Sequence, residues 1–437
     1  MKKFLVLGGG MVVRPLVKYL LGKEDAKVIV ATRTVNKAEA MISGFEDKGK
    51  AVAWTIDKID ELREMVENSD VIISMLPYKY HVDVARICLE KNKHLITTSY
   101  VKPEMQSFDQ EARSKKLIFL NELGLDPGID HMIAMEAIHK IENGNGKVTQ
   151  FYSYCGALPA PDFSDNPFKY KFSWSPKGVV LAAKNSAKYL KDNKVVELHT
   201  EELFSHPFYI DIETIGKLEV YPNRDSLHYI ELYGIEGVKD MFRGTLRYPH
   251  WSELWTAIKK INILDENKMD TTGLSYRGLI AKLNSLNEAD VEEELKNKYN
   301  VSDEIIEKLR WVGLFSDKEI PHASSSPIDL FVELLTEKLM LKGNEKDMVV
   351  LKNDITAVYD DRKEIHHLTL IDFGSPDTDT SVARTVGIPA AIGAYLVASK
   401  VIDVAGVHIP VIPEIYKPIL EELDRIGIKI KREIETF

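Results

Sequence analysis

The stretch that decides the fold is Phe4-Leu5-Val6-Leu7-Gly8-Gly9-Gly10-Met11-Val12-Val13. A short apolar run, typical of a buried strand, ends in three glycines, and a helix-like stretch follows at once. Gly8 suits a tight turn, and Gly10 lets a pyrophosphate approach the backbone at the helix N-terminus. Val13 stands where the dinucleotide fingerprint has its third glycine. The stretch therefore predicts a bound dinucleotide, with contacts from Gly8, Gly10, Met11, Val12 and Val13.

The alternation of strand and helix continues along the first third of the chain. Apolar and β-branched runs predict strands at 4–7, 28–32, 52–56, 71–76, 94–98 and 117–120, with helices such as 36–42, 59–67 and 81–91 between them. Strands that alternate with helices form βαβ units and a parallel sheet covered on both faces. We therefore expect an α/β fold in which residues 1–125 form a Rossmann-type, doubly wound dinucleotide-binding domain.

Beyond residue 130 the pattern becomes irregular. Longer strands are predicted at 148–154, 210–215, 217–221, 348–359 and 365–372, without a helix between each pair. This pattern indicates a second, mixed α+β sheet domain over 126–251 and 346–379. A highly charged helical insertion is expected over 252–345, with helices at 289–299 and 302–312. An apolar helix over 380–400 should pack against the body, and the segment 380–437 is a candidate to complete the first domain.

The composition is that of an ordinary soluble enzyme. The chain has 437 residues, of which 44% are apolar and 28% charged, and its net charge is −10. This acidic balance argues against nucleic acid or an anionic membrane surface as a partner. The two cysteines, Cys88 and Cys155, fit neither a disulfide framework nor a metal site, so we expect no metal and a reducing, cytoplasmic location. No stretch is expected to span a membrane.

The end of the predicted second strand bears on which nicotinamide is bound. An acidic residue at this point holds the ribose 2′-hydroxyl of NAD, but this chain has Thr32, Arg33 and Thr34 there. Arg33, supported by the two hydroxyls, suits the 2′-phosphate of NADP, whereas a solvated surface arginine is the alternative. NADP is therefore favoured, and NAD stays open. Asp57, expected at the end of the third strand, is a candidate contact on the adenine side.

Polar residues follow the predicted fifth and sixth strands. Residues 121–131 read Asn-Glu-Leu-Gly-Leu-Asp-Pro-Gly-Ile-Asp-His, and Ser99 and Tyr100 follow the fifth strand. Open α/β sheets bind ligands beyond the carboxyl ends of their strands. Asp126 is either the N-cap of a helix that begins with Pro127 or a carboxylate that holds a substrate amine, and both roles are compatible. Ser99 and Tyr100 are candidates to bond a substrate carboxylate, and Tyr100 to relay a proton.

Several longer motifs occur in a fixed order along the chain. They cover 8–15, 75–78, 97–101, 121–131, 153–161, 165–167, 170–175, 221–226 and 243–248. In these motifs the sequence resembles saccharopine dehydrogenase of the L-glutamate-forming type, also called saccharopine reductase. The resemblance spans nearly the whole chain and weakens in the helical insertion and in the tail.

The resemblance implies a particular oxidoreductase reaction. Saccharopine is a secondary amine that joins the lysine side-chain nitrogen to the α-carbon of glutamate. Hydride leaves the lysine ε-carbon for NADP, and hydrolysis of the resulting imine gives L-glutamate and 2-aminoadipate 6-semialdehyde. Such a protein binds three carboxylates and orients the reacting carbon against the nicotinamide. The sequence leaves open whether the reaction serves lysine biosynthesis or lysine degradation.

The resemblance also implies where the substrate and the cofactor bind. Arg224 and Arg247 are the best candidates for two-point carboxylate contacts, with Thr245 and Leu246 beside them. The predicted substrate contacts are completed by Ser99, Tyr100 and Asp126, of which Tyr100 and Asp126 are the catalytic candidates. The predicted active site lies between the first two domains. Further cofactor contacts are expected from Leu76, Thr98, Leu125, Pro127, Gly128 and Ser175.

Two other functions compete with this hypothesis. A related enzyme such as carboxynorspermidine dehydrogenase joins another amine and aldehyde, and it needs fewer carboxylate contacts than Arg224 and Arg247 supply. A non-catalytic sensor would bind NADP without turnover. The partners expected are a small-molecule amino-acid substrate and, in the pathway, a lysine–2-oxoglutarate reductase on a separate chain. The choice between a monomer and a homodimer is left open.

Overall fold

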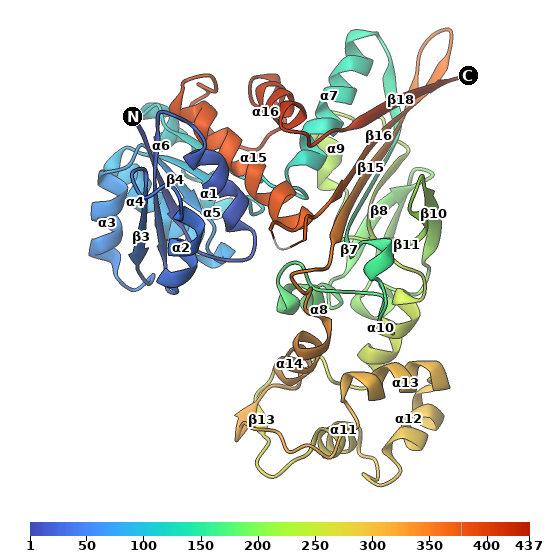
Figure 1. Ribbon diagram of the computed structural model, residues 1–437. Coiled ribbons are helices and arrows are strands. Elements are labelled where there is room, and N and C mark those ends of the chain that lie inside the picture. The colour runs from blue at the N-terminus through green and yellow to red at the C-terminus, as the bar shows by residue number, and fades with distance from the viewer. Residues whose placement is uncertain (377) are drawn as a thin grey trace. The chain divides into compact units, whose positions relative to one another are not determined.

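The βαβ repeat of the first third folds into a parallel sheet with helices around it (Figure 1), and its seven strands have the order β17-β6-β5-β4-β1-β2-β3. Each neighbouring pair runs parallel. The strand order turns back at β1, which pairs with both β2 and β4, and this is the switch point where open α/β sheets bind ligands. The strands are β1 (Lys2–Leu7), β2 (Ala26–Thr32), β3 (Gly49–Ala53), β4 (Val71–Ser74), β5 (His94–Thr97), β6 (Ile118–Leu120) and β17 (Gly406–His408).

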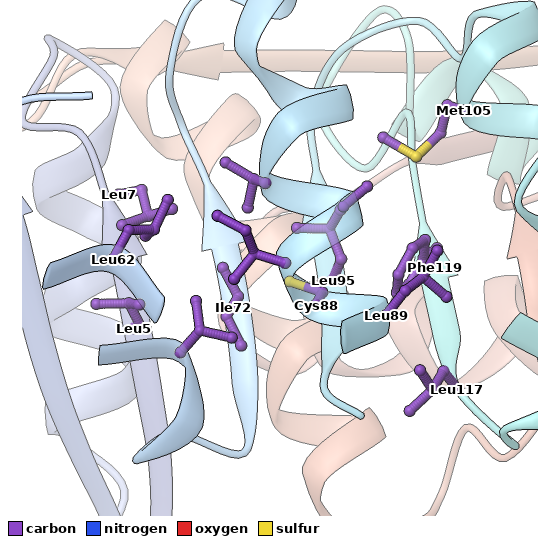
Figure 2. Packing of buried hydrophobic residues seen from close by; sticks show 14 of the residues in the cluster. Leu5, Leu7, Leu62, Ile72, Cys88, Leu89, Leu95, Met105, Leu117 and Phe119 are labelled. Atoms are coloured by element: carbon purple, nitrogen blue, oxygen red, sulfur yellow. The ribbon is translucent and has the colours of Figure 1, made fainter. Parts of the chain in front are cut away.

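Helices cover this sheet, as expected from the apolar character of its strands. They are α1 (Val13–Leu21), α2 (Val35–Ile42), α3 (Ile59–Glu67), α4 (His81–Lys91), α5 (Pro103–Gln106), α6 (Asp109–Ser114), α7 (Ile129–Asn143), α15 (Ser381–Ala398) and α16 (Pro413–Arg425), with the 3₁₀ turn η1 (Tyr78–Tyr80) before α4. Figure 2 shows Leu5, Ile72 and Leu95 of three strands packed with Leu62 of α3 and Cys88 of α4. These side chains are fully buried, so the strand order rests on a continuous apolar core.

Much of the C-terminal segment packs against the first sheet or extends it, as the apolar helix predicted for it suggested, whereas residues 431–436 pair with the second sheet. Helix α15 packs along α1 (Figure 1). Strand β17 adds the last strand of the sheet beside β6. A Cβ atom on Gly387 of α15 would lie 2.5 Å from the Val12 carbonyl oxygen, so a glycine is needed for this close approach. By length and composition alone α15 could cross a membrane, which the sequence analysis did not expect. However, 67% of it is buried inside the protein, as in the core helix of a soluble domain.

The second sheet is mixed and follows the path β10-β11-β12-β7-β15-β16-β18, with β8 paired to β12 and to β9. Strand β12 runs parallel to β7 and antiparallel to β11. The observed α/β class, a parallel sheet plus a mixed sheet, is the predicted one. The strands are β7 (Lys147–Pro159), β8 (Ala187–Lys191), β9 (Lys194–Leu198), β10 (Phe208–Ile212), β11 (Gly216–Pro222), β12 (Asp240–Arg247), β15 (Asp347–Val358), β16 (Lys363–Phe373) and β18 (Lys431–Thr436).

The remaining helices lie in the second half of the chain. They are α8 (Pro176–Ala182), α9 (His228–Leu232), α10 (Trp251–Lys260), α11 (Tyr276–Asn284), α12 (Val291–Tyr299), α13 (Asp303–Val312) and α14 (Pro327–Leu339), with the turns η2 (Pro161–Phe163) and η3 (Thr200–Glu202) and the small pair β13 (Met269–Asp270) and β14 (Ser324–Ser325). The segment 252–345 is mostly helical, as predicted. Helix α8 ends at Ala182, and residues 187–191, whose sequence would also suit a continued helix, form β8.

The computed structural model describes residues 1–376 and 378–437, and they divide into two units. Unit 1 comprises Met1–Thr149 and Leu351–Phe437, and unit 2 comprises Gln150–Val350. These limits differ from the boundaries drawn on the sequence: 126–149 and 351–379 group with unit 1, and the helical segment groups with unit 2. Helix α7 follows the first sheet directly and packs against α16, which accounts for its place in unit 1.

Candidate functional site

The glycine turn after β1 has the geometry that its sequence predicted. Gly8 has a φ of 115°, and a Cβ atom there would lie 2.9 Å from the Met75 carbonyl oxygen. Gly10 differs, because a Cβ atom on it would meet no atom within 4 Å. Helix α1 begins at Val13 with Val12 as its N-cap, so its first backbone N–H groups follow the turn. This open space in front of a helix N-terminus fits a pyrophosphate.

The second strand ends in the polar group that bears on cofactor choice. Thr32 closes β2, and its Oγ1 accepts a 3.4 Å hydrogen bond from the Thr34 backbone N–H. Arg33 is exposed, and it has no ion-pair partner in the described part of the chain. Asp57 is not at the end of the third strand, which stops at Ala53; it is exposed in the turn before α3, and its hydrogen bond with Thr55 lowers its pKa. Its adenine contact stays a prediction.

Tyr100 and Asp126, the two catalytic candidates, come together beyond the ends of β5 and β6. The Tyr100 hydroxyl donates to Asp126 Oδ1 at 3.0 Å. Asp126 is not the N-cap of α7, as one interpretation of the sequence had it. The N-cap is Gly128, which has a φ of 146°. Its backbone N–H donates to Asp130 Oδ1 at 2.6 Å. Asp126 therefore does not cap α7, and its contact with the substrate stays a prediction.

The loop that carries Ser99 and Tyr100 is held by Glu122, which sequence reasoning missed. The Glu122 backbone N–H donates to the Ser99 carbonyl at 3.2 Å, and its Oε1 accepts from the Val101 N–H at 2.8 Å. Oε2 of Glu122 lies 2.8 Å from Nε2 of His131, and both side chains are buried. Glu122 also has a φ of 56°, an unusual conformation for a non-glycine residue. Strained residues of this kind cluster at functional sites.

A second missed residue, His81, connects the ends of β4 and β5. Its Nδ1 lies 2.9 Å from the Ser74 hydroxyl, and its Nε2 lies 2.9 Å from the Ser99 hydroxyl. Burial lowers the pKa of His81 to about 4, so the imidazole is neutral near pH 7. The only signal in the sequence was its place at the start of a helix after the fourth strand.

The other predicted cofactor contacts of unit 1 lie in the loops at the same edge of the sheet. Leu76 follows β4 and Thr98 follows β5. Leu125 and Gly128 share a tight turn, in which the Gly124 N–H donates to the Pro127 carbonyl at 3.0 Å. Met11 is 45% exposed beside the glycine turn. The structure thus brings the predicted cofactor contacts of unit 1, apart from Asp57, to the strand ends, and their individual roles stay predictions.

In unit 2, Arg247 has unused hydrogen-bonding capacity. It closes β12 and is 4% exposed, and its Nη1 donates to the Leu246 carbonyl at 2.7 Å. Its guanidinium lies 5.1 Å from the ring centres of Tyr170 and Trp251. Within residues 1–376 and 378–437, Arg247 Nε and Trp251 Nε1 are buried without a hydrogen-bond partner. Buried donors without acceptors are costly, so this cluster is suited to bind an anionic group.

Arg224 lies at the other end of the same pair of strands. It is exposed in the loop after β11, with a φ of 51°. The preceding Asn223 donates its N–H to the Arg243 carbonyl at 2.8 Å, whereas Arg247 lies four residues farther along β12, about 13 Å at strand spacing. Thr245 is half-buried and Leu246 fully buried between these two points. The two arginines therefore suit separate carboxylates rather than one.

Ser175 and Arg243 are two further polar residues of unit 2. Ser175 caps α8, because its Oγ accepts from the Gly178 N–H at 3.2 Å, and its predicted cofactor contact stays a prediction. Arg243 was not among the predicted residues, although it is buried with its guanidinium 4.2 Å from the Tyr229 ring centre. In the described part of the chain no group of three or more His, Cys, Asp or Glu residues is placed to hold a metal ion.

Two models of known protein families match the chain. Residues 4–120 match the family described as saccharopine dehydrogenase NADP binding domain. Residues 124–428 match the saccharopine dehydrogenase C-terminal domain. Together these matches cover nearly the whole chain, including the glycine turn, the Tyr100–Asp126 pair and Arg247.

Individual relatives give the same result. The chain is 34% identical to saccharopine dehydrogenase [NADP(+), L-glutamate-forming] of Schizosaccharomyces pombe, over 99% of both chains. It is also 34% identical to alpha-aminoadipic semialdehyde synthase of Arabidopsis thaliana, over 99% of this chain but 45% of that longer protein. Among solved structures, the apo saccharopine dehydrogenase (L-Glu forming) of Saccharomyces cerevisiae is similar with a TM-score of 0.91 and 33% identity, covering 100% of each chain.

Proposed function

Because the chain belongs to the saccharopine dehydrogenase family, we propose that it interconverts saccharopine with L-glutamate and 2-aminoadipate 6-semialdehyde. The reaction is an NADP-linked oxidation of a CH–NH group and belongs to lysine metabolism. The chemistry is reversible, so the same site serves either physiological direction.

The Tyr100–Asp126 pair is the observation that carries this proposal. A carboxylate and a phenol joined at 3.0 Å lie at the carboxyl edge of the sheet, where the ligands of open α/β folds bind. We assign the Asp126 carboxylate to the secondary amine of saccharopine, whose positive charge it stabilises. To the Tyr100 hydroxyl, which donates to Asp126, we assign the passing of a proton to or from the amine nitrogen or the attacking water.

Residues of unit 1 fit the NADP that this family binds. When bound, NADP accepts the hydride of the lysine ε-carbon. Gly8 and Gly10 leave space for the pyrophosphate before α1, and Arg33 offers an unpaired guanidinium to the 2′-phosphate. We assign the side chains of Ser99 and Tyr100, beyond the end of β5, to orienting the substrate.

We assign two substrate carboxylates to unit 2. Arg247, with donors still unused, binds one of them, and Arg224 binds another at the opposite end of the β11–β12 pair. Thr245 adds a hydroxyl and Leu246 its backbone. A substrate with three carboxylates has a use for both arginines, whereas a carboxynorspermidine-like product does not.

Initial rates of NADP reduction with saccharopine test this function. We expect turnover with a preference for NADP over NAD, and we expect Arg247→Ala to raise the KM for saccharopine about tenfold or more while the affinity for NADP is kept. Arg63→Ala, an exposed arginine of α3, is the matched control. Binding of NADP without turnover would support a sensor instead. Turnover with an unchanged KM in Arg247→Ala would contradict the role of Arg247.

The cellular setting is part of the same proposal. The two free cysteines, Cys88 and Cys155, fit a reducing cytoplasm. We place the lysine–2-oxoglutarate reductase step on a separate chain, so that purified protein with lysine, 2-oxoglutarate and NADPH gives no turnover. We propose a homodimer, which light scattering at micromolar concentration tests. Fluorescence microscopy of the tagged protein tests the location.

A further inference from the structure

A hydrogen-bonded chain runs from the interior of unit 1 to the proposed substrate site. Ser74, the last residue of β4, is fully buried, and its hydroxyl lies 2.9 Å from Nδ1 of His81. Nε2 of the same imidazole lies 2.9 Å from the hydroxyl of Ser99, which is half-buried. His81 itself is 5% exposed and opens α4. The chain links two strand ends through one ring.

The burial of Ser74 fixes the direction of these hydrogen bonds. In the described part of the chain, His81 Nδ1 is the only partner of the Ser74 hydroxyl. A buried hydroxyl that cannot donate is costly, so Ser74 donates to Nδ1. The neutral imidazole has one N–H, which is then on Nε2 and points to Ser99. Ser99 accepts this bond and keeps its own O–H for another acceptor.

The backbone on both sides of Ser99 is fixed by hydrogen bonds to Glu122. Glu122 accepts from the Val101 N–H and donates to the Ser99 carbonyl, which holds the loop on both sides of Tyr100. The Ser99 side-chain torsion is the remaining freedom. A hydrogen bond from His81 restricts it to an orientation in which the hydroxyl proton faces away from the ring.

We propose that His81 is a positioning residue, which together with Ser74 presents the Ser99 hydroxyl as a hydrogen-bond donor to a carboxylate of the substrate. The assignment rests on the proposed function, since it gives Ser99 a substrate carboxylate as its acceptor. A donor and a carboxylate make a charge-assisted hydrogen bond, whereas a hydroxyl that rotates freely loses part of that energy to ordering.

Two conservative variants separate this role from a merely structural one. In His81→Asn the side-chain amide replaces Nδ1 and keeps the bond to Ser74, but it is too short to reach Ser99. In His81→Gln the amide nitrogen replaces Nε2 and keeps the bond to Ser99. We expect His81→Asn to raise the KM for saccharopine roughly fivefold, with kcat and NADP affinity little changed, and His81→Gln to stay near the unsubstituted protein.

A double substitution tests whether His81 acts through Ser99. In a Ser99→Ala background, His81→Asn should add no further increase in KM, because the hydroxyl that it orients is gone. His139→Asn, which alters another histidine–hydroxyl bond of unit 1, to Tyr416, is the control and should leave KM unchanged. Two results would overturn the positioning role of His81 but not the proposed function. One is an equal rise in KM in His81→Asn and His81→Gln, and the other is a further rise in KM when His81→Asn is added to Ser99→Ala. No turnover by the unsubstituted protein would overturn the proposed function and this inference with it.

Discussion

Asp126 and Tyr100 depend on each other at the scale of single residues. The phenol donates to Asp126 Oδ1 at 3.0 Å, and this hydrogen bond orients the carboxylate. Both residues were predictable, because they follow strand ends of a parallel sheet. Glu122 and His81 were not predictable, because no sequence pattern indicates their roles. The role of Glu122 depends on a φ of 56°. The role of His81 depends on the distance between two strand ends.

Removing the phenol hydroxyl should affect the chemical step. We expect Tyr100→Phe to lower kcat about tenfold, because the variant loses both the proton path and the bond to Asp126, while NADP affinity stays the same. Steady-state rates and cofactor titration measure the two effects separately. Tyr80→Phe, in the neighbouring 3₁₀ turn, is the control. A kcat equal to that of the unsubstituted protein would remove Tyr100 from the mechanism.

His81 should also make stability depend on pH. Its pKa is lowered by burial from 6.5 to about 4, so below pH 6.5 the unfolded chain binds a proton that the folded chain does not. The contribution of His81 to the free energy of unfolding is therefore fully present above pH 6.5 and is lost as the pH falls toward 4. We expect the free energy of unfolding to drop by about 2 kcal/mol more in the unsubstituted protein than in His81→Asn between pH 7 and pH 5. Urea unfolding at both pH values measures it, and equal drops would refute the assignment.

At the scale of elements, the turn between β1 and α1 contains one glycine that the fold requires and another whose surroundings are open to a ligand. Gly8 has a φ of 115° and the Met75 carbonyl close by, whereas the space beside Gly10 is open. We expect Gly8→Ala to lower the free energy of unfolding by about 1–3 kcal/mol. Gly10→Ala should leave stability nearly unchanged but weaken NADP binding about tenfold, because its methyl group enters the pyrophosphate space. Unfolding and cofactor titration of both variants test this, and tight NADP binding by Gly10→Ala would contradict it.

The elements that the sequence predicted are those with local signals. The six strands of the first βαβ units, and helices α3 and α4 with the bounds expected, follow from apolar runs and helical periodicity. Strand β8 was missed, since its residues Ala187–Lys191 continue the apparent helix of α8. Strand β17 has only three residues and pairs with β6 from a distant part of the chain, so only the tertiary fold reveals it.

At the scale of the whole molecule, two units carry complementary chemistry. Unit 1 holds the glycine turn and the Tyr100–Asp126 pair, and unit 2 holds Arg224 and Arg247, to which we assign separate substrate carboxylates. The family was recognisable because motifs from both units occur in one order along the chain. The unit limits were not, because they fall inside the strands β7 and β15 rather than at breaks in composition.

The central claim is that hydride leaves the lysine ε-carbon and that glutamate is released. It is tested most directly with saccharopine that carries deuterium at the lysine ε-carbon. With two deuterium atoms on that carbon, we predict that one appears in the reduced NADP, that the other stays on the aldehyde carbon of 2-aminoadipate 6-semialdehyde, and that L-glutamate is unlabelled. Deuterium retained in a released lysine, with 2-oxoglutarate as the other product, would contradict the account.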